Sequence, residues 1–314
     1  MIDWRTRIQA PHYWRNLALF TAGVVLVGAL IAVIGVVYMR TMSIVHPTRM
    51  ALTVTPTDVG IEDWEAVRFS SSDGLQLAGW FVPPDPASDG ATLVLLHGVR
   101  NQREEMLLQA AMLRRHGYGA LLFDLRAHGE SEGDTSTLGY AEVADLRGAV
   151  DYLLTRPEVN PERVGVMGHS MGGAISIRGA ARIPEIRAVV AESAYTSVKD
   201  NVADGVRALL RLPPGLFAPL VVWLGERETG LELRQVRPID DISQISPRAV
   251  LIVQGGQDPA VPPENGQWLY AAAGEPKEFY LEPKAGHGGY MHVAPEAFEQ
   301  HVVGFLETYL RGSE

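Results

Sequence analysis

The sequence contains no cysteine at all, which excludes disulfides, cysteine-based zinc sites and a thiol nucleophile. Positive charge is also scarce: 27 lysines and arginines stand against 37 aspartates and glutamates, a formal net charge of −10. A nucleic-acid-binding protein would show a basic face, so no nucleic-acid partner is expected. The chain also lacks H-E-x-x-H, an EF-hand loop and a G-x-x-x-x-G-K-[ST] phosphate loop, and we expect neither a metal nor a cofactor.

One long apolar segment lies near the N-terminus. Residues 17–39 contain no charged side chain and are long enough, as a helix, to cross a hydrocarbon core of about 30 Å. Tyr13, Trp14 and Tyr38 flank it, and aromatic side chains favour the membrane interface. A cleaved signal peptide would have a shorter apolar region and a small-x-small cleavage site. We therefore expect a single transmembrane helix at 17–39, contacting the lipid bilayer, after an N-terminal segment at 1–16.

The basic residues around this segment predict its orientation. Arg5, Arg7 and Arg15 precede it, whereas Arg40 and Arg49 follow it. Lysine and arginine are enriched on the cytoplasmic side of membrane proteins, so the excess of one arginine favours a cytoplasmic N-terminus. The rest of the chain is then expected outside the cytoplasm.

The remaining chain alternates between strand-like and helix-like patterns. The strand-like runs are rich in β-branched and aromatic residues and cover 64–70, 75–82, 92–97, 118–124, 163–167, 187–191, 248–254 and 277–281. Apolar residues recur at helical spacing in 102–116, 139–155, 171–183, 264–273 and 294–311. Runs such as TLVLLH and AVLIVQ are apolar almost throughout, which indicates strands covered on both faces. We predict an α/β fold: a mostly parallel eight-stranded sheet flanked by helices, with the first two strands as an antiparallel hairpin at one edge.

Residues 195–246 interrupt this alternation, because they hold two helical patterns, at 196–211 and 214–225, and no convincing strand. An insertion of this size after a strand end is typical of a short helical cap over the sheet. The expected organisation is a linker at 40–63 and one α/β domain at 64–314 that carries the cap.

A possible nucleophile lies between a strand and a helix. The strand RVGVMG runs directly into Gly168-His169-Ser170-Met171-Gly172, which a helical pattern follows. This is G-x-S-x-G in a strand–turn–helix context, where the turn is so tight that side chains at the glycine positions would collide with backbone. Such a turn raises the serine hydroxyl above the sheet. An ordinary glycine-rich turn has the same letters, so the role of Ser170 depends on suitable partners elsewhere.

Two later loops supply those partners. Asp258 follows the apolar strand AVLIVQ, and His287 follows the strand-like EFYLE in a glycine-flanked loop. A serine nucleophile needs a base, and the base needs an orienting carboxylate. The order Ser, Asp, His, each at the carboxyl end of a strand, brings the three side chains to one edge of a parallel sheet. Glu192 is the alternative acid and His292 the alternative base.

The same edge offers donors for a developing oxyanion. The backbone N–H of Met171, directly after the serine, is one candidate. The other is Val99, in the loop His97-Gly98-Val99 after the strand TLVLLH. Arg100 comes next and places a positive charge beside this loop, either as a contact for an anionic substrate or as a solvated surface residue.

Together these motifs resemble the α/β-hydrolase superfamily. The matching segments are HG at 97–98, D-x-R-x-H-G-x-S at 124–131, GHSMGG at 168–173, GGQDPAVP at 255–262 and GHGG at 286–289. The sequence is most similar to the serine-hydrolase branch with monoacylglycerol-lipase-like and serine-aminopeptidase-like members, including membrane-anchored ones. In that family the 124–131 loop borders the site, so the resemblance implies structural roles for Asp124 and His128. Family members with an aspartate or cysteine nucleophile are excluded by Ser170.

The expected function is hydrolysis of a carboxylic ester through an acyl-enzyme on Ser170. The apolar cap segment and the nearby bilayer favour a small-molecule acyl or lipid-like ester as substrate over a charged peptide, although the same apolar residues would also serve simply to pack the cap onto the sheet. A peptidase or a thioesterase would use the same triad, and both alternatives stay open. A non-catalytic membrane-anchored scaffold is the alternative of another class, although decay of an enzyme should first remove a triad member and all are present. No obligate protein partner is indicated.

Overall fold

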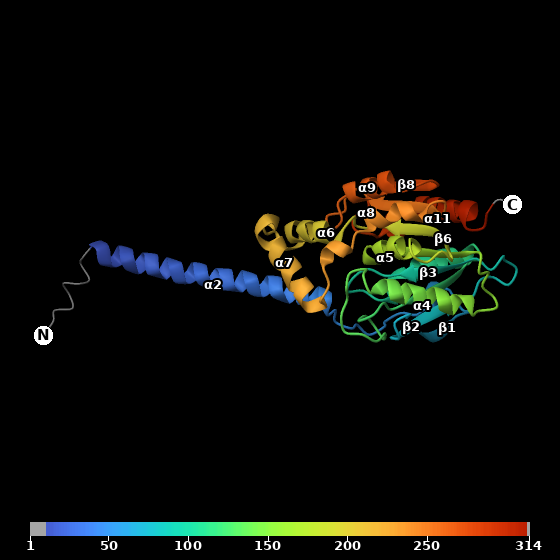
Figure 1. Cartoon of the computed structure of the whole chain (residues 1–314), viewed down its shortest axis with the longest axis horizontal. Helices are drawn as coiled ribbons and strands as arrows, with labels where there is room; N and C mark the ends of the chain where they lie inside the picture. The colour runs from blue at the N-terminus through green and yellow to red at the C-terminus, as the bar shows by residue number, and fades with distance from the viewer. Residues whose placement is uncertain (1–10, 313–314) are drawn as a thin grey trace.

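The computed structural model describes residues 11–312 of the chain (Figure 1). Its centre is one eight-stranded sheet with the order β1-β2-β4-β3-β5-β6-β7-β8. The strands are β1 (Glu65–Ser70), β2 (Gln76–Val82), β3 (Thr92–Leu96), β4 (Gly119–Phe123), β5 (Val164–His169), β6 (Ile186–Glu192), β7 (Ala249–Gly255) and β8 (Lys277–Glu282). β2 pairs antiparallel with β1 and β4, and all other neighbours are parallel. The expected mostly parallel sheet with an antiparallel hairpin at one edge is confirmed.

Helices cover both faces of the sheet, and one extends far beyond it (Figure 1). The longer helices are α2 (Pro11–Val45), α3 (Leu107–Arg115), α4 (Glu142–Leu154), α5 (Met171–Ala180), α6 (Val198–Gly205), α7 (Pro214–Thr229), α9 (Glu264–Ala272) and α11 (Pro295–Tyr309). The shorter helical elements are η1 (Pro56–Val59), η2 (Arg103–Met106), η3 (Val206–Leu210), η4 (Leu233–Gln235), α8 (Pro238–Asp241), η5 (Ile242–Ile245) and α10 (Tyr290–Val293).

The sheet separates two apolar cores. In β3, Val94 and Leu96 face the core beneath α4, α5 and α9, whereas Leu93 and Leu95 face the core beneath α3 and α11. Successive side chains of a strand point to opposite faces, so a strand that is buried on both sides must be apolar throughout. This requirement explains the uninterrupted apolar runs in the sequence.

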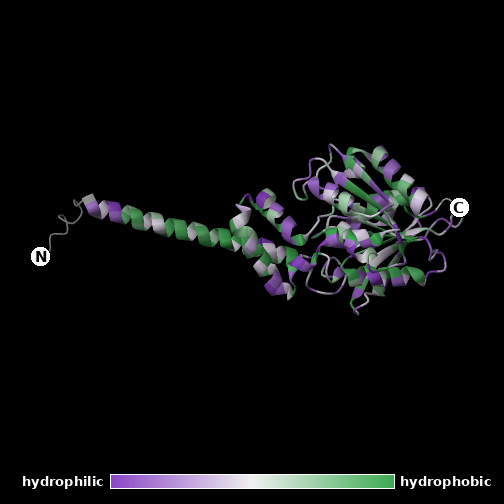
Figure 2. Cartoon of the chain, turned by 45° about the horizontal axis from the view of Figure 1, so that its top comes forward, coloured by the Kyte–Doolittle hydropathy of each residue, from purple (hydrophilic) through white to green (hydrophobic). Residues whose placement is uncertain are grey.

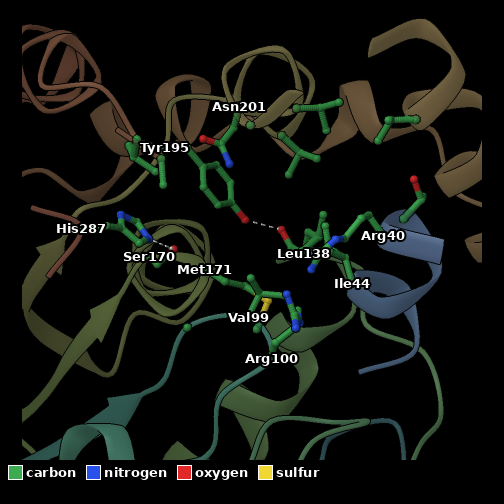
Figure 3. Close-up of a pocket in the computed structure, with 18 of the residues that line it drawn as sticks. Arg40, Ile44, Val99, Arg100, Leu138, Ser170, Met171, Tyr195, Asn201 and His287 are labelled. Atoms are coloured by element: carbon green, nitrogen blue, oxygen red, sulfur yellow. Dashed lines mark hydrogen bonds between the residues drawn. The ribbon is translucent and has the colours of Figure 1, made fainter. Parts of the chain in front are cut away.

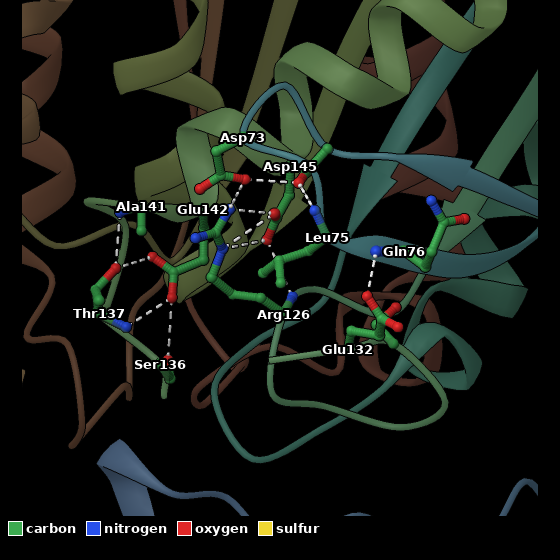
Figure 4. Close-up of polar contacts among 12 residues, drawn as sticks. Asp73, Leu75, Gln76, Arg126, Glu132, Ser136, Thr137, Ala141, Glu142 and Asp145 are labelled. Carbon is green, nitrogen blue, oxygen red and sulfur yellow. Dashed lines mark hydrogen bonds and ion pairs between the residues drawn. The ribbon is translucent and has the colours of Figure 1, made fainter. Parts of the chain in front are cut away.

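Buried polar contacts hold the loop between β4 and α4 (Figure 4). Arg126 pairs with Asp145 of α4 at 2.7 Å and with Asp73 of the β1–β2 turn at 2.8 Å. Burial raises the pKa of Asp145 to about 6, although Arg126 opposes that change. Glu142 of α4 accepts the backbone N–H of Thr137 at 2.7 Å. The loop is therefore tied to two elements on one side of the sheet.

The cap lies between the carboxyl edge of the sheet and the end of α2 (Figure 1). α6 and η3 form its first helical stretch and α7 its second, close to the expected positions. Phe217 and Ala218 of α7 and Val206 of η3 pack with Val37 of α2, whose side chain is fully buried. The cap and the end of α2 thus share a small apolar core of their own.

α2 is longer than the expected apolar segment and continues to Val45, into the residues expected as a linker. Residues 40–45 contain neither proline nor glycine, and the helix ends where Pro47 disfavours a helical conformation for the residue before it. At 1.5 Å per residue the helix is about 50 Å long. Figure 2 shows its middle to be apolar, and there its side chains are exposed. Its end is fixed by His46, which bonds to Glu228 of α7 at 2.8 Å.

A glycine in α4 tests how tightly the helices pack on the sheet. A Cβ at Gly148 would lie 2.2 Å from the backbone oxygen of Ser70. We expect Gly148→Ala to lower the free energy of unfolding by about 2–3 kcal/mol, because backbone cannot retreat as a side chain could. Gly304 of α11 is the control, since nothing lies within 4 Å of its Cβ position. Gly304→Ala should stabilise the protein by about 0.5–1 kcal/mol. Thermal unfolding of the full chain in mild detergent measures both, and equal effects would contradict the packing.

Candidate active site

The chain turns sharply at Ser170, between β5 and α5. The backbone of Ser170 has φ 55° and ψ −113°, a strained combination for a serine. A Cβ at Gly172 would lie 2.2 Å from the carbonyl oxygen of Leu96, and one at Gly168 would lie 2.4 Å from the backbone of Gly172. These contacts leave no room for side chains. They bring the start of α5 against the end of β3 and raise Ser170 above the sheet.

Ser170, His287 and Asp258 form one chain of hydrogen bonds, although the sequence separates them widely. Figure 3 shows the first of these bonds, between Ser170 and His287. The Ser170 hydroxyl lies 2.9 Å from Nε2 of His287, and Nδ1 of His287 lies 2.8 Å from Oδ2 of Asp258. The Asp258 side chain is completely buried. Its other oxygen accepts the backbone N–H groups of Ala260 and Val261 at 2.9 and 2.8 Å. The carboxylate is therefore held so that it fixes the imidazole with Nε2 toward the serine.

The alternative acid and base lie elsewhere. Glu192 ends β6, and its carboxylate bonds to Nε2 of Gln109 at 3.4 Å. His292 lies on the short helix α10 with an exposed side chain. Neither takes part in the hydrogen bonds that join Ser170 to Asp258.

The backbone N–H groups of Val99 and Met171 lie beside Ser170. Both residues line the cavity next to the serine, Val99 from the loop after β3 and Met171 from the first position of α5. Within residues 11–312, no acceptor is hydrogen-bonded to either N–H. Two free donors at a helix start and a neighbouring loop are the arrangement that stabilises a tetrahedral oxyanion.

Two histidines and a glutamate hold the loop from Gly98 to Arg100. Nδ1 of His97 donates to the Gly98 carbonyl at 2.7 Å, and Glu105 accepts the Gly98 N–H at 2.5 Å. Burial lowers the pKa of His128 to about 3, so its ring is neutral, and Nδ1 donates to the Arg126 carbonyl at 2.8 Å. Nε2 is therefore the acceptor of the Arg100 N–H, at 3.2 Å. These bonds fix the peptide groups on both sides of Val99, so the direction of the Val99 N–H is fixed as well. His128 has the structural role that the family resemblance implied.

Asp124 also has a structural role. Its side chain is fully buried and pairs with Arg103 at 2.8 Å. The same carboxylate accepts the backbone N–H groups of Arg103 and Glu130, both at 2.9 Å. Asp124 thus joins the start of η2 to the loop after β4, and it makes no contact with the serine.

Two carboxyl groups behind Ser170, those of Glu105 and Glu192, differ in charge below neutral pH: one is ionised and the other is protonated. Burial alone would raise the pKa of Glu105, but the hydrogen bond and charge of His169, 3.0 Å away, together with the Gly98 N–H outweigh burial and lower the pKa to about 2. Burial alone would lower the pKa of His169, but the hydrogen bond and charge of Glu105, with other nearby carboxyl groups, outweigh burial and raise it. For Glu192, burial dominates and raises the pKa to about 7. Glu105 and His169 form an ion pair, whereas Glu192 keeps its proton up to near-neutral pH.

A cavity of about 500 Å³ opens beside Ser170 and His287 (Figure 3). This volume lies within the range of roughly 300–1,000 Å³ that small-molecule sites occupy. One wall is formed by apolar residues of the cap, Val198, Val202, Val206, Leu210 and Val221. A second wall comes from the end of α2, with Val37, Arg40, Thr41, Ser43 and Ile44. In the described part of the chain, no three His, Asp or Glu side chains are grouped to hold a metal ion.

No sequence motif points to two features of this site, the ion pair of Glu105 with His169 and the cavity wall formed by the end of α2. Glu105 lies 64 residues before its partner His169, and neither position carries a motif that indicates the pair. The wall from α2 depends on the helix reaching Val45. The absence of a helix breaker before Pro47 was the available signal for this extension.

The raised pKa of Glu192 predicts a pH-dependent stability. An unfolded chain binds this proton with a pKa near 4.5, whereas the folded protein binds it with a pKa of about 7, so folding stability falls as the pH rises from 4.5 to 7. The difference between these two pKa values corresponds to about 3 kcal/mol of folding free energy. We expect Glu192→Gln to gain about that much stability relative to wild type at pH 8 and little at pH 4.5. Urea unfolding at both values measures it, with Glu62→Gln, at an exposed position, as control. A gain that does not change with pH would contradict the burial of a proton-binding group.

Comparison with known proteins identifies the family. The model of the alpha/beta hydrolase family matches residues 93–301. YfhR of Salmonella typhi is 29% identical over 285 residues, covering 84% of this chain and 87% of that protein. The alpha/beta hydrolase domain-containing protein WAV2 of Arabidopsis thaliana is 27% identical over 269 residues, with 82% of each chain covered. Among solved structures, the Pyrococcus furiosus esterase Pf2001 is 29% identical with a TM-score of 0.72, over 85% of this chain and 98% of that one. The chain belongs to the alpha/beta hydrolase family.

Proposed function

We propose that this hydrolase cleaves a carboxylic ester through an acyl-enzyme on Ser170, with His287 as general base and Asp258 as its orienting carboxylate. The observation that carries the proposal is the continuous hydrogen bonding from Ser170 Oγ to Nε2 of His287 at 2.9 Å and from Nδ1 to Asp258 at 2.8 Å. The similarity to the esterase Pf2001 supports an ester as the bond that is cleaved.

The first half of the reaction forms the acyl-enzyme. Ser170 Oγ attacks the acyl carbon while His287 Nε2 takes the hydroxyl proton, and Asp258 stabilises the imidazolium that results. The carbonyl oxygen becomes an oxyanion that accepts hydrogen bonds from the N–H groups of Val99 and Met171. The imidazolium then gives its proton to the leaving alkoxide, and the carbon–oxygen bond to the alcohol breaks.

The second half releases the acid. Water attacks the acyl-enzyme carbon, and His287 takes a proton from that water as it did from the serine. The tetrahedral intermediate uses the same two backbone donors. When it collapses, the proton returns to Ser170 Oγ and the carboxylic acid leaves, so the enzyme is restored without any cofactor.

The long apolar helix supports a reaction at a membrane. Residues 12–45 form a helix long and apolar enough to span a bilayer, and most of its uncharged part is exposed. We propose that it is a single-pass anchor with the hydrolase domain outside the cytoplasm, as the arginine distribution favours. The apolar cap wall supports an acyl or lipid-like ester. A peptidase or a thioesterase would use the same side chains, and these activities are the alternative functions.

Activity-based labelling tests the nucleophile. We expect a fluorophosphonate probe to label the full chain in mild detergent and to fail with Ser170→Ala, because the probe reacts with an activated serine. Hydrolysis of a p-nitrophenyl ester should fall by about 10⁵-fold or more in the same variant.

Ser176→Ala is the matched control for that experiment. Its hydroxyl lies on the same helix but donates to the Gly172 carbonyl at 2.8 Å and does not reach His287. The control should still be labelled. Labelling of Ser170→Ala at the wild-type level, or an unlabelled wild type that is folded by circular dichroism, would overturn the proposed mechanism.

Glu105 is a positioning residue in this mechanism, because it holds the Gly98 N–H and His169 but lies outside the hydrogen-bonded triad. We expect Glu105→Ala to lower kcat by about tenfold to a hundredfold with little change in KM, since a loop shift of about 1 Å moves an oxyanion donor. Glu105→Gln keeps an acceptor for the Gly98 N–H and should recover part of the loss. Steady-state kinetics with a short ester measure both variants. Equal loss in both would show that charge, and not loop position, matters.

A further inference from the structure

The cavity beside Ser170 lies against the part of α2 that enters the proposed membrane layer. Val33 and Val37 contact the cap, and they precede the end of the uncharged run at Met39 by six and two residues. At 1.5 Å per residue these positions are about 9 Å and 3 Å inside that end. Interfacial helices bury their apolar faces about 5–10 Å deep in a bilayer. The cap therefore sits at the depth of the interface.

The outer surface of α7 fits this position. From Pro214 to Gly225 the helix carries no charged side chain, and Leu216 and Trp223 are exposed. An exposed apolar surface next to a membrane helix is suited to lipid contact, and tryptophan favours the interface. The apolar wall from η3 lies inside the cavity, and the apolar surface of α7 lies outside it. Together they favour entry of an acyl chain from the bilayer.

Two cations lie at the α2 side of the same cavity, across from Ser170 and His287 (Figure 3). Arg40 projects from α2, and Arg100 projects from the oxyanion loop. Within residues 11–312, neither forms an ion pair, whereas Arg103 and Arg126 near the same loops are paired with buried aspartates. In a chain of net charge −10, two unpaired arginines in one cavity favour an anionic ligand.

The backbone supports a specific role for Arg100. Its φ is 61°, a left-handed conformation that glycine adopts readily and arginine rarely does. The hydrogen bond from its N–H to His128 at 3.2 Å holds that conformation. Strain of this kind persists where the surrounding structure fixes it, and it occurs frequently at ligand sites. The Arg100 side chain, although exposed, lines the cavity next to Val99.

We propose that the substrate is a lipid acyl ester with a phosphate-bearing head group, taken from the bilayer along α2. The acyl chain occupies the apolar part of the cavity between Val37 and the cap, the ester lies at Ser170, and Arg40 and Arg100 bind the phosphate. Arg40 directly follows Met39, at the level where head groups lie. This inference rests on the proposed esterase function and names its substrate class.

Two lipids that differ only in the phosphate test this proposal. We compare lysophosphatidic acid with monoacylglycerol of the same long acyl chain, in micelles of a neutral detergent, using the full-length protein. Wild type should prefer the phosphate-bearing ester by about tenfold to a hundredfold in kcat/KM, because hydrogen bonds to charged groups are the stronger ones. Arg40→Gln and Arg100→Gln should each lower that ratio by about tenfold, mainly through KM, and Arg40→Lys should retain most of it.

Arg227→Gln is the matched control, because Arg227 is an exposed arginine of α7 whose guanidinium lies over Trp223 and outside the cavity. It removes the same charge near the membrane and should leave the ratio unchanged. A loss of preference in this control as large as in the cavity variants would show general attraction to anionic surfaces and overturn the specific site. Equal hydrolysis of the two lipids by wild type would overturn it as well.

Two further measurements separate the possible failures. A short-chain, water-soluble acyl glycerol phosphate that is hydrolysed as efficiently as the long-chain lipid would overturn the bilayer origin of the substrate. Fluorophosphonate labelling of Ser170 in every variant reports on the nucleophile independently. Labelled enzyme without a phosphate preference means that this inference alone fails, whereas unlabelled, folded wild type means that the proposed esterase function fails.

Discussion

The contact between the backbone of α5 and that of β3 is the constraint on which the site depends. At Gly172 there is no room for even a methyl group beside the Leu96 carbonyl. This closeness forces the sharp turn at Ser170 and places the first N–H of α5 beside the loop after β3. The proposed pair of oxyanion donors, from two separate segments, depends on it. A looser turn would leave the hydroxyl and the donors too far apart to act on one carbonyl group.

Around this turn, buried polar groups fix the loops that no regular element holds. Glu105 and His169 form an ion pair behind the serine, and the fully buried Asp258 carboxylate accepts hydrogen bonds from His287 and from two backbone N–H groups. Each satisfied group makes its loop costly to move, because an unpaired buried charge is strongly unfavourable. The buried carboxyl group of Glu192 lacks enough partners to offset the cost of burying its charge, so it keeps its proton to a higher pH.

The sequence predicted the sheet well, because its signals are local. Strands buried on both sides must be apolar, so runs such as TLVLL in β3 were found within one or two residues. The candidate triad was equally accessible, since each member follows a strand at the same edge of the sheet; its catalytic role stays a prediction that the hydrogen bonding supports. Glu105 was not found, because pairing across 64 residues leaves no periodic pattern. The cavity wall from α2 is not predicted for another reason. The charge at Arg40 ends the apolar segment, whereas the helix itself continues to just before Pro47.

The burial of Val37 under the cap has a mechanical consequence for an anchored enzyme. A transmembrane helix adjusts its tilt to the thickness of the bilayer, and packing against neighbouring elements sets how far it does so. In the anchored enzyme that we propose, this neighbour is the cap, so a change in the tilt of α2 would change the width of the cavity. The proposed anchoring would therefore make the cavity width depend on bilayer thickness, and the same protein would present a different cavity in a thin membrane and in a thick one.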